Sequence, residues 1–403
     1  MSEGKVYRDR NLRMVFLVTL MAVMGVSAIT PAFPGVVSEL DIDRSEIGLL
    51  ITVFTLPGIV LTPILGIAAD RLGRKRVLVP SLLVFGLFGG ACMFARDLDT
   101  LLLLRFLQGI GAGALGSMNV TLIGDLFKGG DCVAAMGYNS AILSVGTASY
   151  PFIGGLLAEA EWYYPFGLPF LAIPVGIVVL LFLASPEPHF DSELGEYLNE
   201  AWKDLRSREV MALLLASVSS FIIVFGSVLS FAPILMGERF GSSSALIGAM
   251  LSLMSVTTAI ASSRLVFFAR RLSERRTILI AFFLYGTALI SVPLIDALYL
   301  LTIPLAVMGF AQGISYPTIQ TLFSRKASTE YRAAFMSSNG MALRLGQTIG
   351  PLLMGSALAY GGLDAPFMVG GAVAMVTFVL MFILFEGNVR ICDIANDLYR
   401  PLE

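Results

Sequence analysis

The sequence predicts an all-α membrane protein with twelve transmembrane helices arranged as two six-helix bundles. Three observations support this fold class. Hydrophobic residues make up 56% of the 403 positions and charged residues only 14%, whereas about 25% of residues in a soluble domain are charged. Apolar stretches of about 20 residues, long enough to cross a hydrocarbon core of about 30 Å, recur along the whole chain. The two halves of the chain also share residues at a constant shift of 200 positions.

The twelve predicted spans are apolar stretches separated by polar segments. Each is expected to be helical, because a helix satisfies its own backbone polar groups inside a bilayer. In chain order the predicted bounds are 13–36, 45–68, 77–95, 100–123, 134–158, 166–185, 209–235, 245–268, 275–295, 298–322, 333–360 and 365–386. An even number of spans places both ends of the chain on one side of the membrane.

The positive charges indicate which side that is. Of the 27 Lys and Arg residues, only Arg44, Arg96 and Arg239 fall in segments on the far side, while Arg105 and Arg344 lie inside spans. All the others fall on the side of the termini. Because Lys and Arg accumulate in cytoplasmic loops, we expect both termini to be cytoplasmic in a multi-pass protein of the cell membrane.

The longest polar interruption divides the chain into two bundles. Residues 186–208 include apolar side chains at helical spacing, such as Leu194, Leu198 and Trp202, which predict an amphipathic cytoplasmic linker on the membrane surface. A solvated, disordered loop is the alternative interpretation. The predicted organisation is an N-terminal bundle (1–185), this linker, and a C-terminal bundle with a short cytoplasmic tail (209–403).

Internal repetition supports the division. At the shift of 200 residues, glycines, prolines and an asparagine coincide without gaps: Gly109, Gly113, Asn139, Gly146, Pro151 and Gly155 correspond to Gly309, Gly313, Asn339, Gly346, Pro351 and Gly355. This predicts duplicated halves related by an axis along the membrane normal. Two similar bundles around a central interface are typical of transporters, in which the interface opens to either side in turn.

Other functional classes find little support in the residues. Cys92, Cys132 and Cys392 lack metal-ligand spacing, and the sole histidine, His189, lies in the linker. The net charge of −2 favours no nucleic-acid partner. We therefore expect no metal, no cofactor and no enzymatic activity, and the absence of a Walker-type phosphate loop argues against ATP-driven transport by this chain.

A charged turn follows the second span. Its predicted functional residues are Gly66, Asp70, Arg71, Gly73 and Arg74, together with Asp125 at the end of span 4. The partial positive charge at the N-terminus of span 11, near Ala333, can attract Asp70 and latch the two halves together. Ordinary topology charges are the alternative. The second half carries Arg270, Ser273 and Glu274 at the corresponding positions, so we expect only the first-half turn to act as the latch.

This turn resembles the signature loop of the major facilitator superfamily. Arg105-Phe-Leu-Gln108-Gly109-Ile-Gly111-Ala-Gly113 fits the same family, and Gly146-Thr-Ala-Ser-Tyr-Pro151-Phe-Ile-Gly154-Gly155 is similar to the Gly/Pro motif of its twelve-span drug:proton antiporter branch. The resemblance implies the major facilitator fold. It also implies that Asp70, Arg74 and Asp125 form a relay that tunes the conformational switch, and that Arg105, extended by Gln108, takes part in proton transfer.

Two arginines inside spans are candidate coupling or cavity residues. An intramembrane guanidinium needs a partner, water or the bundle interior. Arg105 either serves function or anchors helices near the outer headgroups. Arg344 lies roughly 16 Å into span 11; it can bind an anionic group of a cargo, pair with a carboxylate, or hydrogen-bond to nearby carbonyls.

Glycines and prolines within spans are expected to serve as hinges and helix-packing surfaces, because they remove side chains or backbone hydrogen bonds. The candidates are Gly109, Gly113, Gly146, Pro151, Gly154, Gly155, Gly346, Gly350, Pro351 and Gly355.

The leading functional prediction is a monomeric secondary active transporter that works by alternating access and couples efflux of small organic or drug-like compounds to protons. Span 1 lacks the Asp or Glu that multidrug antiporters of this type often carry, which weakens export of cationic drugs. Transport of anionic or neutral metabolites, such as organic acids or sugars, is therefore an alternative. A non-transporting membrane sensor is a further one.

Overall fold

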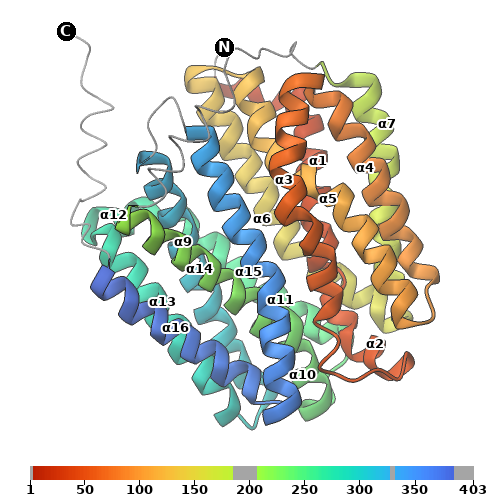
Figure 1. Cartoon of the computed structure of the whole chain (residues 1–403), viewed down its shortest axis with the longest axis vertical. Coiled ribbons are helices and arrows are strands. Elements are labelled where there is room, and N and C mark those ends of the chain that lie inside the picture. Colours follow the sequence, from red (N-terminus) through yellow and green to blue (C-terminus); the bar gives the residue numbers. More distant parts are fainter. Residues whose placement is uncertain (1–2, 185–206, 327–331, 385–403) are drawn as a thin grey trace.

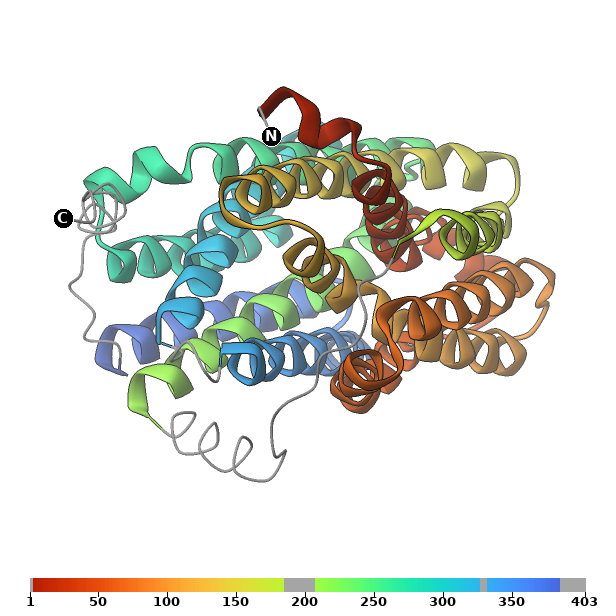
Figure 2. The same ribbon diagram turned by 90° about the horizontal axis from the view of Figure 1, so that it is seen from above.

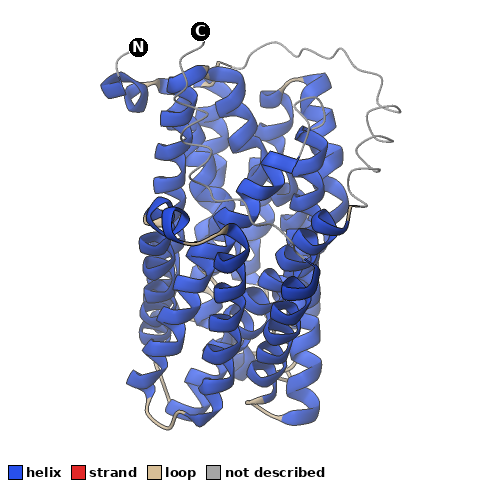
Figure 3. Ribbon diagram, turned by 90° about the vertical axis from the view of Figure 1, so that its left-hand side faces the viewer, coloured by secondary structure: helices blue, strands red, loops and turns tan. Residues whose placement is uncertain are grey.

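The computed structural model describes residues 3–184, 207–326 and 332–384. In these residues all regular secondary structure is helical (Figure 3). The predicted linker falls outside them except for Ser207 and Arg208, as do His189, Cys392 and the C-terminal tail. The domain boundaries and the amphipathic linker therefore remain predictions.

The helices follow the predicted spans in order. We call helices α1 to α7 the first half: α1 (Arg10–Ser27), a 3-10 helix (Thr30–Ala32), α2 (Phe33–Glu39), α3 (Leu49–Leu72), α4 (Arg74–Ala91), α5 (Leu98–Leu126), α6 (Gly129–Ala160), a 3-10 helix (Tyr164–Leu171) and α7 (Ala172–Phe182). The second half comprises α9 (Arg208–Phe221), a π-helix (Ile222–Phe231), α10 (Ala232–Phe240), α11 (Ser244–Ser263), α12 (Leu265–Arg271), α13 (Glu274–Ser291), α14 (Thr302–Lys326), α15 (Arg332–Gly361) and α16 (Ala365–Leu384).

Eleven helical segments in the described ranges are long and apolar enough to cross a membrane. The twelfth predicted span, 333–360, coincides with α15, which has the length but is not among the eleven. Arg344 and Gln347 interrupt its apolar character. The all-helical membrane architecture is confirmed, whereas the count of twelve spans and the side on which the termini lie stay predictions.

Local sequence explains where several helices begin and break. Asp97 caps α5 by accepting a hydrogen bond from the Thr100 amide (2.8 Å), and this backbone hydrogen bond lowers the pKa of the Asp97 carboxyl. Pro31 lies in the 3-10 helix that separates α1 from α2. The single span predicted at 245–268 is wrong in one respect: the chain breaks at Arg264, which ends α11 and precedes α12.

Figures 1 and 2 show the two halves as helix groups side by side, the first in red to yellow-green and the second in green to blue. Within the first half, α5 packs against α3 and α4, and α6 packs against α1. Within the second, α14 packs against α11 and α13, while α15 packs against α9 and the π-helix. Two helix pairs form most of the contact between the halves, namely α6 with α11 and α3 with α15.

These two pairs repeat one arrangement. At Gly48, the residue before α3, a Cβ would lie 2.9 Å from the Pro351 carbonyl oxygen of α15. At the positions shifted by 200, Gly248 of α11 lies against the Pro151 carbonyl of α6. Gly355 likewise packs on Ser45, and Gly155 on Ser244. The sequence repeat therefore corresponds to equivalent backbone contacts, and glycine is required at these positions because the helices approach too closely for a side chain.

Candidate functional site

The charged turn after α3 brings the three predicted relay residues together. Gly73 has φ 99°, a left-handed conformation that suits glycine, and it separates α3 from α4. Arg74 then pairs with Asp70 (2.5 Å between Nη2 and Oδ1) and with Asp125 at the end of α5 (3.0 Å between Nε and Oδ2). Arg71 lies in the last turn of α3.

The structure leaves two features of this turn open to experiment. A Cβ on Gly66 would meet no described atom within 4 Å, so packing does not require glycine there. The predicted partner of Asp70, the N-terminus of span 11 near Ala333, adjoins residues outside the described ranges. The latch remains a prediction, while the Asp70–Arg74–Asp125 cluster is a contact within the first half.

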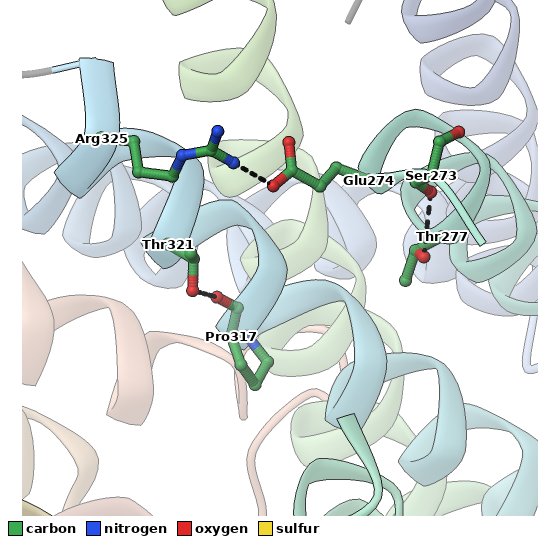
Figure 4. Close-up of polar contacts among 6 residues, drawn as sticks. All are labelled: Ser273, Glu274, Thr277, Pro317, Thr321 and Arg325. Atoms are coloured by element: carbon green, nitrogen blue, oxygen red, sulfur yellow. Dashed lines mark hydrogen bonds and ion pairs between the residues drawn. The ribbon is translucent and has the colours of Figure 1, made fainter. Parts of the chain in front are cut away.

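The second half carries a corresponding ion pair with exchanged charges (Figure 4). Glu274, which begins α13, pairs with Arg325 near the end of α14. The shift of 200 places Glu274 on Arg74 and Arg325 on Asp125. Glu274 is 3% exposed, and Ser273 caps its helix by accepting from the Arg276 amide (3.4 Å). Sequence reasoning noted the inverted Glu274 but missed Arg325, which the same shift applied to Asp125 identifies.

Arg105 is a buried clamp between three helices. Its guanidinium is 1% exposed and donates to the Leu50 carbonyl of α3 (Nε, 3.0 Å), the Gly25 carbonyl of α1 (Nη1, 2.8 Å) and Gln108 Oε1 (Nη1, 2.6 Å). It also lies 4.2 Å over the Phe54 ring. An arginine whose side chain extends to the outer headgroups is ruled out, because Arg105 is turned into the first half, whereas anchoring of helices, the other part of that alternative, agrees with these contacts.

Two polar atoms beside this clamp have no hydrogen-bond partner among the described residues, Arg105 Nη2 and Gln108 Nε2. No described carboxylate lies within ion-pair distance of Arg105. The arrangement can therefore hold α1, α3 and α5 together through a charged donor, and it keeps two donors for a further acceptor. This geometry is compatible with the proton-transfer role that the family resemblance implies.

Arg344 lies where the two halves meet. Its side chain, on α15, rests against Gly58 of α3 and Gly116 of α5. Its Nη1 donates to Gln347 Oε1 (3.2 Å). One turn along, Thr348 joins the halves by accepting from Thr52 at its carbonyl (3.0 Å) and by contacting Thr55 Oγ1 (2.8 Å).

The predicted hinge residues divide into two kinds of contact. Pro151, Gly155, Pro351 and Gly355 lie between the halves, as described above. The others pack inside a half: Gly109 against the Phe54 carbonyl, Gly113 against Leu61, Gly146 against Leu20 and Val23, Gly154 against the Ala28 carbonyl, Gly346 against the Val218 carbonyl and Gly350 against the Ile222 carbonyl. A packing role accounts for each of these glycines, and hinge motion remains a prediction.

The hydrogen bonds that can be assigned between the described parts of the two halves lie at one end of the molecule. They comprise the ion pair of Arg44 with Glu238, the Ala245 amide to Glu159 (3.1 Å), and the contacts of Thr348. All lie on the side of Arg344 away from the Arg74 and Glu274 clusters. At the opposite end, each charged cluster is paired within its own half.

Comparison with known families and proteins gives consistent matches. The family model described as Major Facilitator Superfamily matches residues 15–266 and 226–390. The chain is 25% identical to the tetracycline resistance protein, class B, of Escherichia coli over 86% of this chain and 88% of that protein. It is 26% identical to multidrug resistance protein 1 of Bacillus subtilis over 86% and 90%. It is 34% identical to the bacillibactin exporter of Bacillus subtilis, over 39% of this chain and 41% of that protein.

Solved structures share the fold. The nucleoside transporter NupG has a TM-score of 0.77 at 13% identity, covering 94% of this chain and all of that one. A bacterial homologue of the human lysosomal transporter Spinster, in an inward-facing and unoccupied conformation, has a TM-score of 0.74 at 16% identity, covering 94% and 95%. The human organic anion transporter MFSD10 has a TM-score of 0.69 at 19% identity, covering 94% and 100%.

Proposed function

Because the chain belongs to the Major Facilitator Superfamily, we propose that it is a secondary active transporter that exports small organic or drug-like compounds in exchange for protons. Membership of the superfamily supports the assignment as a transporter. The similarity to tetracycline and multidrug resistance proteins over 86% of this chain supports export as the direction.

The observation that carries the proposal is the one-sided joining of two equivalent halves. Pro151 and Pro351 meet Gly248 and Gly48 in two matching helix pairs, so the two pairs share the same close backbone contact. Rocking about these close backbone contacts would separate the joined end and bring the two charged ends together. This is the movement that alternating access needs.

The charged clusters fit a switch at the end that closes in the other state. Asp70, Arg74 and Asp125 would tune closure of the first half, and Asp70 would meet the N-terminus of α15. The halves would move as the bundles 1–185 and 209–403, with both termini cytoplasmic and the protein acting as a monomer. The concentration of Lys and Arg in the segments on one side supports this topology.

A second candidate function is the transport of organic acids or other anionic metabolites. It is favoured by Arg344, which lies between the halves without a described carboxylate partner. Span 1 contributes no carboxylate to neutralise a cationic cargo. The two candidates share the mechanism and differ in the charge of the cargo.

Purified protein in liposomes with an internal pH dye tests the proposal. Cationic, neutral and anionic compounds are added under an imposed proton gradient, and cargo-dependent proton flux is the expected result. Arg105→Ala should abolish the flux, and Arg105→Lys, which keeps the charge but not the forked donors, should reduce it. Melting temperatures of both variants separate lost coupling from lost folding. Equilibration of labelled cargo without proton flux would contradict proton coupling.

A further inference from the structure

Arg344 crosses from one half to the other. It belongs to α15 of the second half, but its guanidinium lies on the first half: a Cβ at Gly58 of α3 would be 3.2 Å from Nε, and one at Gly116 of α5 would be 3.5 Å from Nη2. The two glycines therefore form a floor of bare backbone beneath the charge. Any larger residue at Gly58 would displace the side chain.

The guanidinium is incompletely satisfied. Arginine has five N–H donors, and in the described part of the chain one of them is used, by Gln347 Oε1. Arg74, Arg239 and Arg325 each pair with a carboxylate, and Arg105 donates to three oxygens. Arg344 has no described carboxylate within ion-pair distance. A positive charge at this depth in a membrane protein needs acceptors or water, and an anion would satisfy the remaining donors.

The internal repeat does not extend to the residues around Arg344. At the shift of 200 residues, Arg344 corresponds to Ser144, while Gly58 and Gly116 correspond to Thr258 and Tyr316. The neighbouring glycine and proline contacts between the halves are repeated. Around Arg344, however, one half has a large side chain facing two glycines, whereas the corresponding positions hold a small serine facing a threonine and a tyrosine. The arginine and the space that holds it therefore occur together.

Unpaired polar atoms lie one turn from the same glycines. Thr62 is four residues beyond Gly58 on α3, and Asn119 is three residues beyond Gly116 on α5. Thr62 Oγ1 and Asn119 Oδ1 are buried and have no hydrogen-bond partner among the described residues. Because α3 and α5 both run toward the charged clusters, the two atoms lie on the side of Arg344 away from the contacts that join the halves. Buried polar atoms without protein partners need water or a ligand. Of the two, the Thr62 hydroxyl can donate to an anion, whereas the Asn119 oxygen can only accept.

We propose that Arg344 binds the anionic group, a carboxylate or a sulfonate, of the compound that this protein transports. The site lies between α3, α5 and α15, with the Gln347 amide nitrogen and the Thr62 hydroxyl as further donors to the anion. The planar guanidinium can bind such a group through two parallel hydrogen bonds. This inference rests on the proposed transport function and specifies the charge of its cargo.

Binding measured by calorimetry in detergent tests the site without transport. The probes are naphthalene-2-sulfonate, its neutral sulfonamide and a naphthylmethylammonium ion. The sulfonate should bind the wild-type protein more tightly than either analogue. Arg344→Gln should weaken sulfonate binding by about 30-fold or more, because it removes one partner of a charge pair, and should leave sulfonamide binding unchanged.

Two control variants and a second assay keep the outcomes distinct. Arg239→Gln removes an arginine that pairs with Asp364 at the edge of the second half and should not change sulfonate binding. Arg344→Lys keeps the charge and should bind sulfonate with intermediate affinity, even if Arg344→Gln fails to fold. Equal wild-type affinity for sulfonate and sulfonamide, or unchanged sulfonate affinity in folded Arg344→Gln, would overturn the site. Proton flux with a neutral compound would then show separately whether the transport proposal holds.

Discussion

Two buried asparagines occupy equivalent positions and illustrate how single residues support the halves. Asn139 of α6 accepts a hydrogen bond from Thr19 of α1 (2.6 Å), and Asn339 of α15 accepts one from Ser217 of α9 (2.7 Å). The two sets of hydrogen bonds differ in their further members. Thr19 also donates to the Val15 carbonyl, whereas Asn339 also donates to Gln320 (3.0 Å).

Replacing each asparagine by alanine should therefore have unequal effects. Asn339→Ala leaves Gln320 and Ser217 without this partner, while after Asn139→Ala the Thr19 hydroxyl keeps its backbone acceptor. A buried polar group left unpaired costs about 1–3 kcal/mol, so Asn339→Ala should lower the melting temperature more. Thermal unfolding of both variants in one detergent checks this. Equal melting temperatures would mean that Gln320 finds another partner.

At the scale of helices, the ends of α4 and α13 carry the same ion pair with opposite polarity. In the first half, the Arg74 and Asp125 side chains are 14% and 35% exposed, and Asp70 provides a second carboxylate. In the second, Glu274 is 3% exposed and pairs with Arg325, which is 34% exposed. The carboxylate of the second-half pair is thus more deeply buried than that of the first-half pair.

Arg325→Gln should consequently destabilise the protein more than Asp125→Asn. Breaking a buried pair leaves a poorly solvated charge, whereas exposed pairs contribute about 0–1 kcal/mol. Because Arg325 is partly exposed, we expect a difference of about 1–2 kcal/mol. Thermal unfolding gives the comparison, and the double variant Glu274→Arg with Arg325→Glu should recover part of the loss. Equal effects of the two single variants would show that burial of Glu274 is unimportant.

For transport, we expect the first-half turn that contains Asp70 to matter more than the second-half turn that contains Arg270, which is the opposite of the order expected for stability. If Asp70 latches the halves, Asp70→Asn should reduce transport at saturating cargo while leaving the melting temperature nearly unchanged. Arg270→Ala, at the corresponding second-half position, should have the smaller effect, because a positive charge is not attracted to a helix N-terminus. Initial transport rates in liposomes measure both. Equal losses would contradict an asymmetric latch.

The close helix pairs at the joined end allow a further test at this scale. Gly248→Ala places a methyl group against the Pro151 carbonyl and should force α6 and α11 apart, whereas Gly66→Ala meets no described atom within 4 Å. The first should raise the labelling rate of a cysteine placed at Ser244, which packs on Gly155 in the same helix pair, and the second should not. If Gly248→Ala leaves labelling unchanged, the two helices can adjust without opening this end.

For the whole molecule, the decisive feature is that the halves are joined at one end and paired internally at the other. Arg44 and Glu238 form the ion pair between the halves at the joined end. Replacing both by cysteine, in a background without Cys92, Cys132 and Cys392, permits a reversible cross-link there. We expect the cross-link to stop transport and reduction to restore it. Continued transport by fully cross-linked protein would rule out opening at this end as a required step.

Much of the fold follows from local properties that a sequence displays directly. Hydropathy and the polar segments between spans located the helices to within a few residues, as for the span predicted at 209–235 and the helical segment 208–240. The repeat of Pro151 and Gly155 in Pro351 and Gly355 predicts equivalent halves from the sequence alone. Family membership followed from the charged turn and the glycine motifs, because backbone conformation and close packing restrict which residues can stand there.

The other partners of the buried arginines could not be derived in this way. Besides Gln108, the acceptors of Arg105 are backbone carbonyls 55 and 80 residues away, and carbonyls carry no signature in the sequence. Arg344 was recognisable as an anomaly, but Gly58 and Gly116 acquire meaning only when α15 is packed on α3 and α5. Hydrophobicity and helical periodicity are properties of neighbouring residues, whereas the environment of a buried charge depends on how helices distant in the chain are placed against one another.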